Sequence, residues 1–260
     1  MDLNDVLLLL AAGVAAGAVN ALAGGGSLIT YPALLTTGLG SVVANMTNSV
    51  SVSAGYLAAA FGTREDHRAI RVSTTGLLLT TALGTAAGGA LLMVTPAAAF
   101  DKIVPFLVLS AVGVLAFQQR LRGVVGHPRE LSKGRRTVAV HTLVGLGAVY
   151  GGYFGAALGI ILVAVLGLVI DENLTRINAL KNTLSLVVGV VTAVEFGLLG
   201  STVGSPVNWG SVAVLMPATL VGGYVGARVG RRLPPRVLRA LIVTFGTTVG
   251  LFLFWRAFGE

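Results

Sequence analysis

Three consecutive glycines and a serine, Gly24 to Ser27, interrupt a stretch that is otherwise apolar enough to lie within a lipid bilayer. At membrane depth, non-helical backbone is tolerated only where it is buried in protein or lines a wet cavity. We expect Ser27 to cap a helix that begins here, and the free amides of Gly24, Gly25 and Gly26 to form an anion site with the helix dipole. The alternative, close helix packing on small residues, better fits the scattered glycines, such as Gly13, Gly17, Gly222 and Gly226.

Two later apolar segments carry amide and hydroxyl side chains, which supply the directional hydrogen bonds that an oxyanion needs and are costly to leave unpaired in lipid. In the second of them, Asn178, Asn182 and Ser185 follow an i, i+4, i+7 spacing and share one helical face, with Lys181 beside it. We expect Lys181 to be the counter-charge of an anion, unless it snorkels to the membrane surface. Helix-to-helix bonding is the alternative for single hydroxyls. The predicted substrate-binding residues on these segments are Asn45, Asn48, Ser51, Asn178, Lys181, Asn182 and Ser185.

Glu195 is the other ionisable residue inside an apolar segment. It follows Lys181 by four turns, about 21 Å along a helix, so the two cannot pair. A proton-coupling carboxylate is one role, and a solvated side chain near the membrane surface is the alternative. The chain has no cysteine and only three histidines, and it shows no Ser-His-Asp set or paired carboxylates within the membrane. We therefore expect no enzyme activity, no cofactor and no metal site.

The composition places these residues in a membrane protein. Hydrophobic residues make up 55% of the 260 and charged residues 11%, and the mean hydropathy is +0.87, which predicts an all-α polytopic fold. The second and seventh apolar segments, at about 12 residues, are too short to cross the hydrocarbon core and read as half-helices. The ten segments cover residues 5–22, 27–38, 43–62, 72–94, 100–119, 137–155, 158–170, 174–199, 208–228 and 236–256.

The basic residues are distributed so as to orient the chain in the membrane. Of the 18 lysines and arginines, all but Lys102, Arg256 and Lys181 fall in or beside loops on one side of the predicted bilayer. Basic residues remain on the cytoplasmic side, so we predict a multi-pass protein with both termini extracytoplasmic. The net charge of +8 is thus explained by topology, and no nucleic-acid partner is expected.

The chain also contains a repeat. An offset of 134 superposes residues 48–55 on 182–189, and an offset of 138 superposes 84–88 on 222–226. Corresponding loops carry opposite charge bias, which predicts two five-segment repeats in inverted topology. Secondary transporters have this organisation, with the binding site at the repeat interface near the midplane and one repeat rocking against the other. The predicted units are residues 1–119, a basic cytoplasmic linker at 120–136, and residues 137–260.

Several long motifs give the chain a family resemblance. The stretches "AGGGSLITYPALLTTGL", "ANMTNSVSVSAGYLAAAFGTRED", "FDKIVPFLVL" and "VGGYVGARVGRRLPPRVLRALI" resemble the TauE/SafE family of sulfite or organosulfonate exporters. The resemblance implies export of a small sulfur oxyanion, such as sulfite or sulfoacetate, across the bacterial inner (plasma) membrane. It maps the family's glycine-rich turn onto Gly24 to Ser27 and its asparagine helices onto Asn45 and Asn48 and onto "NALKN". The chain departs from the family at Asn208, where an aspartate is frequent, and at Glu195, where an apolar residue is expected.

Two other function classes are weighed against a transporter. A small-anion channel would use the same polar path without alternating access. A membrane scaffold or enzyme subunit is the less favoured alternative, and an enzyme would need a catalytic set that the sequence lacks. The expected partners are a small anionic substrate and the lipid bilayer, with a homodimer left open.

Overall fold

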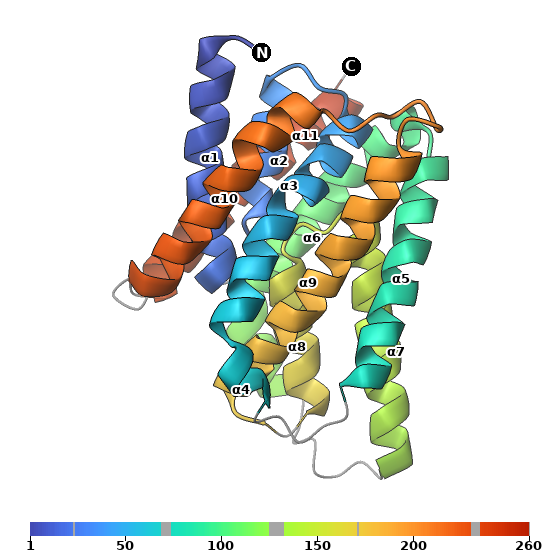
Figure 1. Ribbon diagram of the computed structural model, residues 1–260, viewed down its shortest axis with the longest axis vertical. Helices are drawn as coiled ribbons and strands as arrows, with labels where there is room; N and C mark the ends of the chain where they lie inside the picture. The colour runs from blue at the N-terminus through green and yellow to red at the C-terminus, as the bar shows by residue number, and fades with distance from the viewer. Residues whose placement is uncertain (23, 69–73, 125–132, 171, 230–234, 260) are drawn as a thin grey trace.

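The computed structural model is a bundle of α-helices (Figure 1). The structure describes residues 1–260 except 23, 69–73, 125–132, 171, 230–234 and 260, and the described residues include no strand. The helices are α1 (Leu3–Leu22), α2 (Ser27–Thr36), α3 (Ser41–Gly62), α4 (Arg64–Arg68), α5 (Thr75–Val94), α6 (Ala97–Val124), α7 (Lys133–Tyr153), α8 (Leu158–Val169), α9 (Leu174–Leu199), α10 (Trp209–Val229) and α11 (Pro235–Phe258).

The predicted apolar segments correspond one to one to all of these helices except α4, a five-residue helix at the end of α3. The half-length prediction is confirmed, since α2 has 10 residues and α8 has 12. Four of the described helices, α1, α5, α9 and α10, are both long and apolar enough to cross a membrane. The all-helical, membrane-spanning class predicted from composition is therefore confirmed.

Short polar residues fix where several helices begin. The Asp2 and Asp5 side chains accept each other's backbone amides, 2.9 and 3.2 Å away, at the start of α1. Asn173 accepts the Arg176 amide at 2.9 Å and caps α9. Asn208 accepts the Ser211 amide at 2.9 Å at the start of α10. Each satisfies an amide that has no partner within its own helix.

The polarity of the bundle is that of a membrane protein. Large apolar side chains lie on its outer faces, among them Leu79, Leu198 and Trp255. Polar side chains lie inside, among them Thr30, Asn48 and Lys181. Exposed apolar area on this scale suits contact with lipid chains.

The helix contacts have a two-fold regularity. α1 packs on α10 as α7 packs on α5, and α3 meets α10 as α9 meets α5. The half-helix contacts repeat likewise, because α2 touches α1, α3 and α11 while α8 touches α7, α9 and α6. α3 packs on α9 and α6 on α11. Exchanging the five helices α1, α2, α3, α5 and α6 for α7 to α11 in order therefore reproduces these contacts. The exception among the described residues is α3, which also packs on α6, while the corresponding helices α9 and α11 do not pack closely.

Glycines let α1 approach α10 closely and α5 approach α7 closely, and these contacts also correspond. A β-carbon on Gly17 would lie 2.1 Å from the Thr219 carbonyl oxygen, and one on Gly152 would lie 2.1 Å from that of Thr85. Only glycine lets the backbones approach so closely, which confirms the packing role expected for the scattered glycines. A second pair of matching contacts, also at 2.1 Å, joins Gly222 to the Val14 carbonyl and Gly88 to the Val149 carbonyl.

These contacts match α5 to α10 at an offset of 134, because Gly88 takes the place of Gly222. Sequence matching gives 138 for the same helices, with Gly88 on Gly226. The difference of four residues is about one helical turn and preserves the helix face. Glycines repeat at that spacing in both helices, so their sequence pattern matches equally well in either register.

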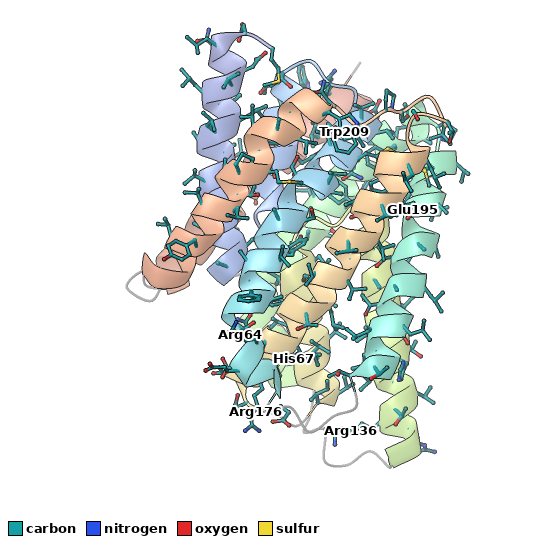
Figure 2. The ribbon with its side chains drawn as sticks, viewed as in Figure 1. Arg64, His67, Arg136, Arg176, Glu195 and Trp209 are labelled. Atoms are coloured by element: carbon teal, nitrogen blue, oxygen red, sulfur yellow. The ribbon has the colours of Figure 1, made fainter. Side chains whose placement is uncertain are left out.

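Both termini lie at one end of the bundle (Figure 1), which we call the termini end, and α4 lies at the other, the loop end. Figure 2 shows Arg64, Arg136 and Arg176 towards the loop end and Trp209 towards the termini end. The described basic loop residues labelled there thus gather at one end, as the charge distribution predicts.

Candidate substrate site at the two chain breaks

The first break separates α1 from α2. Gly24 has a φ of +80°, a left-handed conformation that favours glycine. The Gly26 amide donates 2.7 Å to the side-chain oxygen of Asn20, which lies in the last turn of α1. The expectation that Ser27 caps α2 is wrong, because Ser27 is the first helical residue and no side chain at the Gly26 cap position forms a cap bond. Asn20, six residues upstream, holds the turn instead.

The second break separates α7 from α8 and is built differently. Gly155 has a φ of +71°, and Ala157 is left-handed at +56°, a conformation that costs a residue with a β-carbon about 1–2 kcal/mol. The Tyr150 hydroxyl donates 2.8 Å to the Ala156 carbonyl oxygen and holds this turn. A tyrosine hydrogen bond and one strained alanine therefore replace the glycine run of the first break.

The two breaks touch each other inside the bundle. A β-carbon on Gly24 would lie 2.5 Å from the Gly159 Cα, and one on Gly159 would lie 2.7 Å from the Gly24 Cα. A β-carbon on Gly159 would also lie 3.1 Å from the Lys181 side-chain Cδ. The starts of α2 and α8 thus meet, and Lys181 of α9 packs against their contact. The structure brings together the predicted glycine turn and the predicted lysine, which lie far apart in sequence.

Lys181 is buried, with only 2% of its surface exposed. Its stem packs on Gly159 and does not snorkel to the surface, so that alternative is wrong. Among the described residues it has no carboxylate partner. Desolvating an ammonium group costs several kcal/mol, and an uncompensated buried charge is strongly destabilising. A negatively charged group bound at the contact between the breaks would offset this cost.

Several buried polar atoms near the breaks have no hydrogen-bond partner among the described residues: Asn20 Nδ2, Asn45 Oδ1 and Ser185 Oγ. Asn45 also donates 2.9 Å to the Tyr153 carbonyl at the end of α7. Ser185 lies one helical turn from Lys181, on the same face. Buried polar atoms without partners are rare, and these are available to a ligand or to water.

A small cavity adjoins the breaks. Its volume is about 10 Å³, about the minimum for one water molecule, so this conformation has no room there for an oxyanion. The Ser27 and Tyr56 hydroxyls interact beside it. Binding would require the two halves of the bundle to move apart. The lining residues are Ser27, Ser49, Val52, Tyr56, Gly151, Gly155, Leu158, Val188 and Thr192.

Other predicted site residues bond helices together. Asn182 donates to the Thr63 hydroxyl at 3.3 Å, which links α9 to α3. Asn48 accepts a bond from Thr30 and so fixes α2 against α3. The Ser51 hydroxyl donates to a carbonyl of its own helix, and Asn178 is half-buried near the start of α9. Of the three residues predicted to share an inward face, Asn182 and Ser185 are buried and Asn178 is half-buried, and Lys181 beside them is buried too.

Sequence reasoning missed several residues of the breaks, among them Asn20, Thr30 and Tyr150. Asn20 had a detectable signal, because a polar residue about one helical turn before a glycine run can cap the turn. The stretch from Tyr153 to Gly159 was expected to be the second-half counterpart of the glycine turn, but the contact of Gly159 with Gly24 could not be predicted, since the two are far apart in sequence.

Glu195 lies towards the termini end, away from Arg176 and the loop end (Figure 2). Glu195 is half-buried, and its Oε2 is buried and has no hydrogen-bond partner among the described residues. Its carboxylate packs on α5, where a β-carbon on Gly89 would lie 2.2 Å from Oε2. The small residue at position 89 therefore makes the space that this side chain occupies.

Across the described ranges, no group of three or more His, Asp or Glu side chains is arranged to hold a metal ion. The two described histidines contact threonines, His67 with Thr183 at 3.1 Å and His141 with Thr80 at 2.6 Å.

Comparison with known proteins extends over nearly the whole chain. A family model described as sulfite exporter TauE/SafE matches residues 9–253. A Haemophilus influenzae protein named "Probable membrane transporter protein" is 27% identical over 245 residues, covering 94% of this chain and 92% of that protein. The Escherichia coli K12 protein named "Probable membrane transporter protein YfcA" is 27% identical over 257 residues, covering 94% and 88%. No solved structure gives a significant match.

Proposed function

The chain belongs to the TauE/SafE family of membrane transporters, and we propose that it exports a small sulfur oxyanion, sulfite or an organosulfonate such as sulfoacetate. The proposal places the substrate at the contact of the two chain breaks. The protein is a multi-pass membrane protein, and the basic residues at the loop end support a cytoplasmic location for that end, with both termini outside the cell.

One observation carries the proposal. Lys181 is buried against the contact of the two breaks and has no carboxylate partner among the described residues. A sulfite or sulfonate group supplies the missing negative charge and accepts several hydrogen bonds at once. The starts of α2 and α8 add two positive dipole ends at the same place. The Ser185 hydroxyl and Asn20 amide have donors that no described residue uses.

The proposed mechanism is alternating access by two inverted repeats, residues 1–119 and 137–260. The exchangeable helix contacts and the matched glycine contacts support a two-fold relation between these units. The cavity of about 10 Å³ supports a closed state, which opens to one side when one unit rocks against the other. An anion tends to leave a cell whose interior is negative, so the membrane potential favours export.

Counterflow in proteoliposomes tests this proposal. Vesicles loaded with unlabelled sulfite or sulfoacetate should accumulate labelled substrate from outside against its gradient, because a carrier exchanges substrate across the membrane. A channel shows no such trans-stimulation and would contradict the mechanism.

The Lys181→Met variant should lose counterflow by more than tenfold, because a buried charge-assisted contact contributes about 1.5–3 kcal/mol. Lys102→Met is the matched control, since it removes a lysine that is exposed at the start of α6. Equal loss in both variants would contradict a specific role for Lys181.

A further inference from the structure

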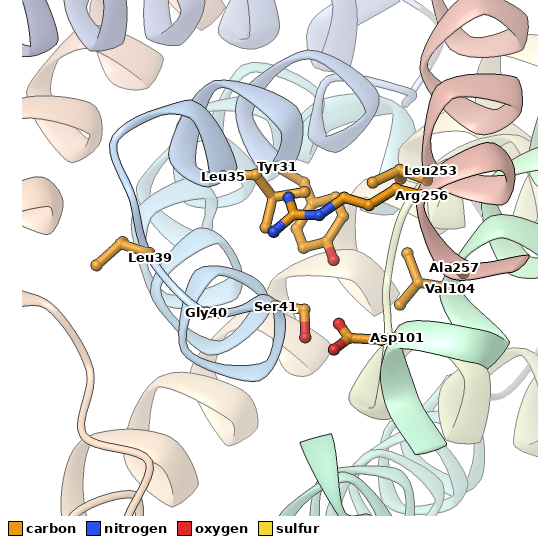
Figure 3. Close-up of a pocket in the computed structure, with 10 residues that line it drawn as sticks. All are labelled: Tyr31, Leu35, Leu39, Gly40, Ser41, Asp101, Val104, Leu253, Arg256 and Ala257. Atoms are coloured by element: carbon orange, nitrogen blue, oxygen red, sulfur yellow. The ribbon is translucent and has the colours of Figure 1, made fainter. Parts of the chain in front are cut away.

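A second polar cavity lies at the termini end, apart from the breaks (Figure 3). Its volume is about 170 Å³. Liquid water takes about 30 Å³ per molecule, so the cavity has room for a small organic molecule. α2, the start of α3, the start of α6 and the end of α11 form its walls. Its polar lining comes from Tyr31, Ser41, Asp101 and Arg256.

The two charged residues of this cavity have opposite signs but do not pair. Asp101 near the start of α6 and Arg256 near the end of α11 both line it, and neither has an ion-pair partner in the described part of the chain. Figure 3 shows the Tyr31 hydroxyl between the Arg256 side chain and the Asp101 carboxylate. A cation and an anion that share a cavity without contact can each meet a different part of one ligand.

Two hydroxyls of the cavity also have no partner. Tyr31 Oη and Ser41 Oγ are buried and make no hydrogen bond to any described residue, and Tyr31 is only 2% exposed. Figure 3 shows these two hydroxyls on the same side of the cavity as the Asp101 carboxylate, with the Arg256 side chain extending from α11 towards α2. A buried hydroxyl left without a partner costs about 1–3 kcal/mol, so the cavity is built to receive a polar guest.

We propose that this cavity is a binding site for a small zwitterion, whose anionic group meets Arg256 and whose ammonium group meets Asp101. A simple anion would satisfy Arg256 but be repelled by Asp101, and a simple cation would have the reverse problem. A zwitterion satisfies both charges and offers acceptors and donors to Tyr31 and Ser41. This site does not depend on the substrate proposed at the breaks.

The cavity is connected to the second break through Tyr31. The Tyr31 ring packs edge-on against Phe154, with ring centroids 5.4 Å apart, and Phe154 directly follows the end of α7. Phe100, whose ring is 6.3 Å from that of Phe154, extends this aromatic layer. The side chain that offers its hydroxyl to the cavity therefore also packs against the residue that begins the second break.

Isothermal titration of the purified protein with three matched compounds tests the proposal. Taurine is a zwitterion, ethanesulfonate keeps only its anion, and ethylamine keeps only its cation, all on a two-carbon chain. We expect saturable taurine binding and affinities at least tenfold weaker for the other two, because each loses one charge-assisted contact. Equal binding of taurine and ethanesulfonate, or no taurine binding, would overturn the proposal.

Variants locate the binding. Asp101→Asn and Arg256→Gln should each weaken taurine binding at least tenfold, and Asp101→Asn should leave ethanesulfonate binding no weaker than before. Lys102→Gln is the matched control, because Lys102 is also charged and exposed beside Asp101 but does not line the cavity. If Lys102→Gln weakens taurine binding as much as Arg256→Gln does, taurine does not bind in this cavity as proposed.

Two further variants distinguish a lost binding contact from misfolding, and binding at this cavity from binding at the breaks. Tyr31→Phe removes one oxygen and should weaken taurine binding about fivefold to tenfold; unchanged affinity would overturn the role of Tyr31. Lys181→Met should leave taurine binding intact even where sulfite counterflow is lost. If Lys181→Met abolishes taurine binding while Arg256→Gln does not, taurine binds at the breaks and this cavity is no site.

Discussion

Gly24→Ala tests the contact between the two chain breaks. The substitution adds a single methyl group, and the structure assigns it two penalties. The first is backbone strain, because Gly24 has a φ of +80°. The second is a collision, because the new carbon would lie 2.5 Å from the Gly159 Cα and 2.9 Å from its carbonyl carbon. Both atoms belong to backbone, so rotation of a side chain cannot relieve the collision.

The expected loss in the free energy of unfolding is the sum of these two penalties. A β-carbon in the left-handed region costs about 1–2 kcal/mol, and overpacking a tight contact costs about 1–3 kcal/mol. Together they lower the free energy of unfolding by about 2–5 kcal/mol. We also expect weaker sulfite binding, because the relief of this collision displaces α2 from α8.

Gly38→Ala is a matched control for the strain. Gly38 has a φ of +84°, but no atom lies within 4 Å of its would-be β-carbon. We therefore expect a loss of about 1–2 kcal/mol from strain alone. Denaturant titration in mixed micelles, followed by far-ultraviolet circular dichroism, gives both values. If Gly24→Ala and Gly38→Ala are equally stable and bind sulfite equally, the breaks do not meet as described.

Three other predictions concern the same region. Asn20→Ala should lower the free energy of unfolding by about 1 kcal/mol, as loss of a helix cap does, and Asn20→Asp should restore most of it; equal denaturation midpoints for the two would remove the capping role. Tyr150→Phe should destabilise by about 1 kcal/mol, because the Ala156 carbonyl loses its donor, and an unchanged midpoint would show that the second break holds without it. If Glu195 is the coupling carboxylate, Glu195→Gln should abolish acceleration of transport by an imposed pH gradient and leave counterflow intact, whereas unchanged acceleration would rule out this role.

The number and lengths of the helices could be predicted from the sequence, because the thickness of the bilayer determines how long a spanning helix must be. Apolar segment lengths separate full helices from half-helices, and α2 and α8 are short as predicted. The inward face of α9 was also predictable, since helical spacing alone places Asn182 and Ser185 on the buried side with Lys181 beside them.

The hydrogen-bond partners of these side chains could not be predicted from the sequence. Spacing indicates which face of a helix turns inward but not which neighbour it meets. The bonds by which Asn182 joins α9 to α3 and Asn48 joins α3 to α2 were therefore not predictable. The cap at the first break was assigned to Ser27 by proximity, whereas Asn20 reaches it from the preceding helix. The cavity at the termini end was not predicted, because Asp101 and Arg256, which both line it, are distant in sequence.

Calorimetric titration of sulfite into wild-type protein and Lys181→Met tests the central claim most directly, with Lys102→Met as the control for loss of a lysine. If an oxyanion binds at the meeting of the two breaks, wild type and Lys102→Met bind sulfite with the same affinity, and Lys181→Met binds at least tenfold more weakly while remaining folded. Equal sulfite affinity in all three proteins would contradict the account.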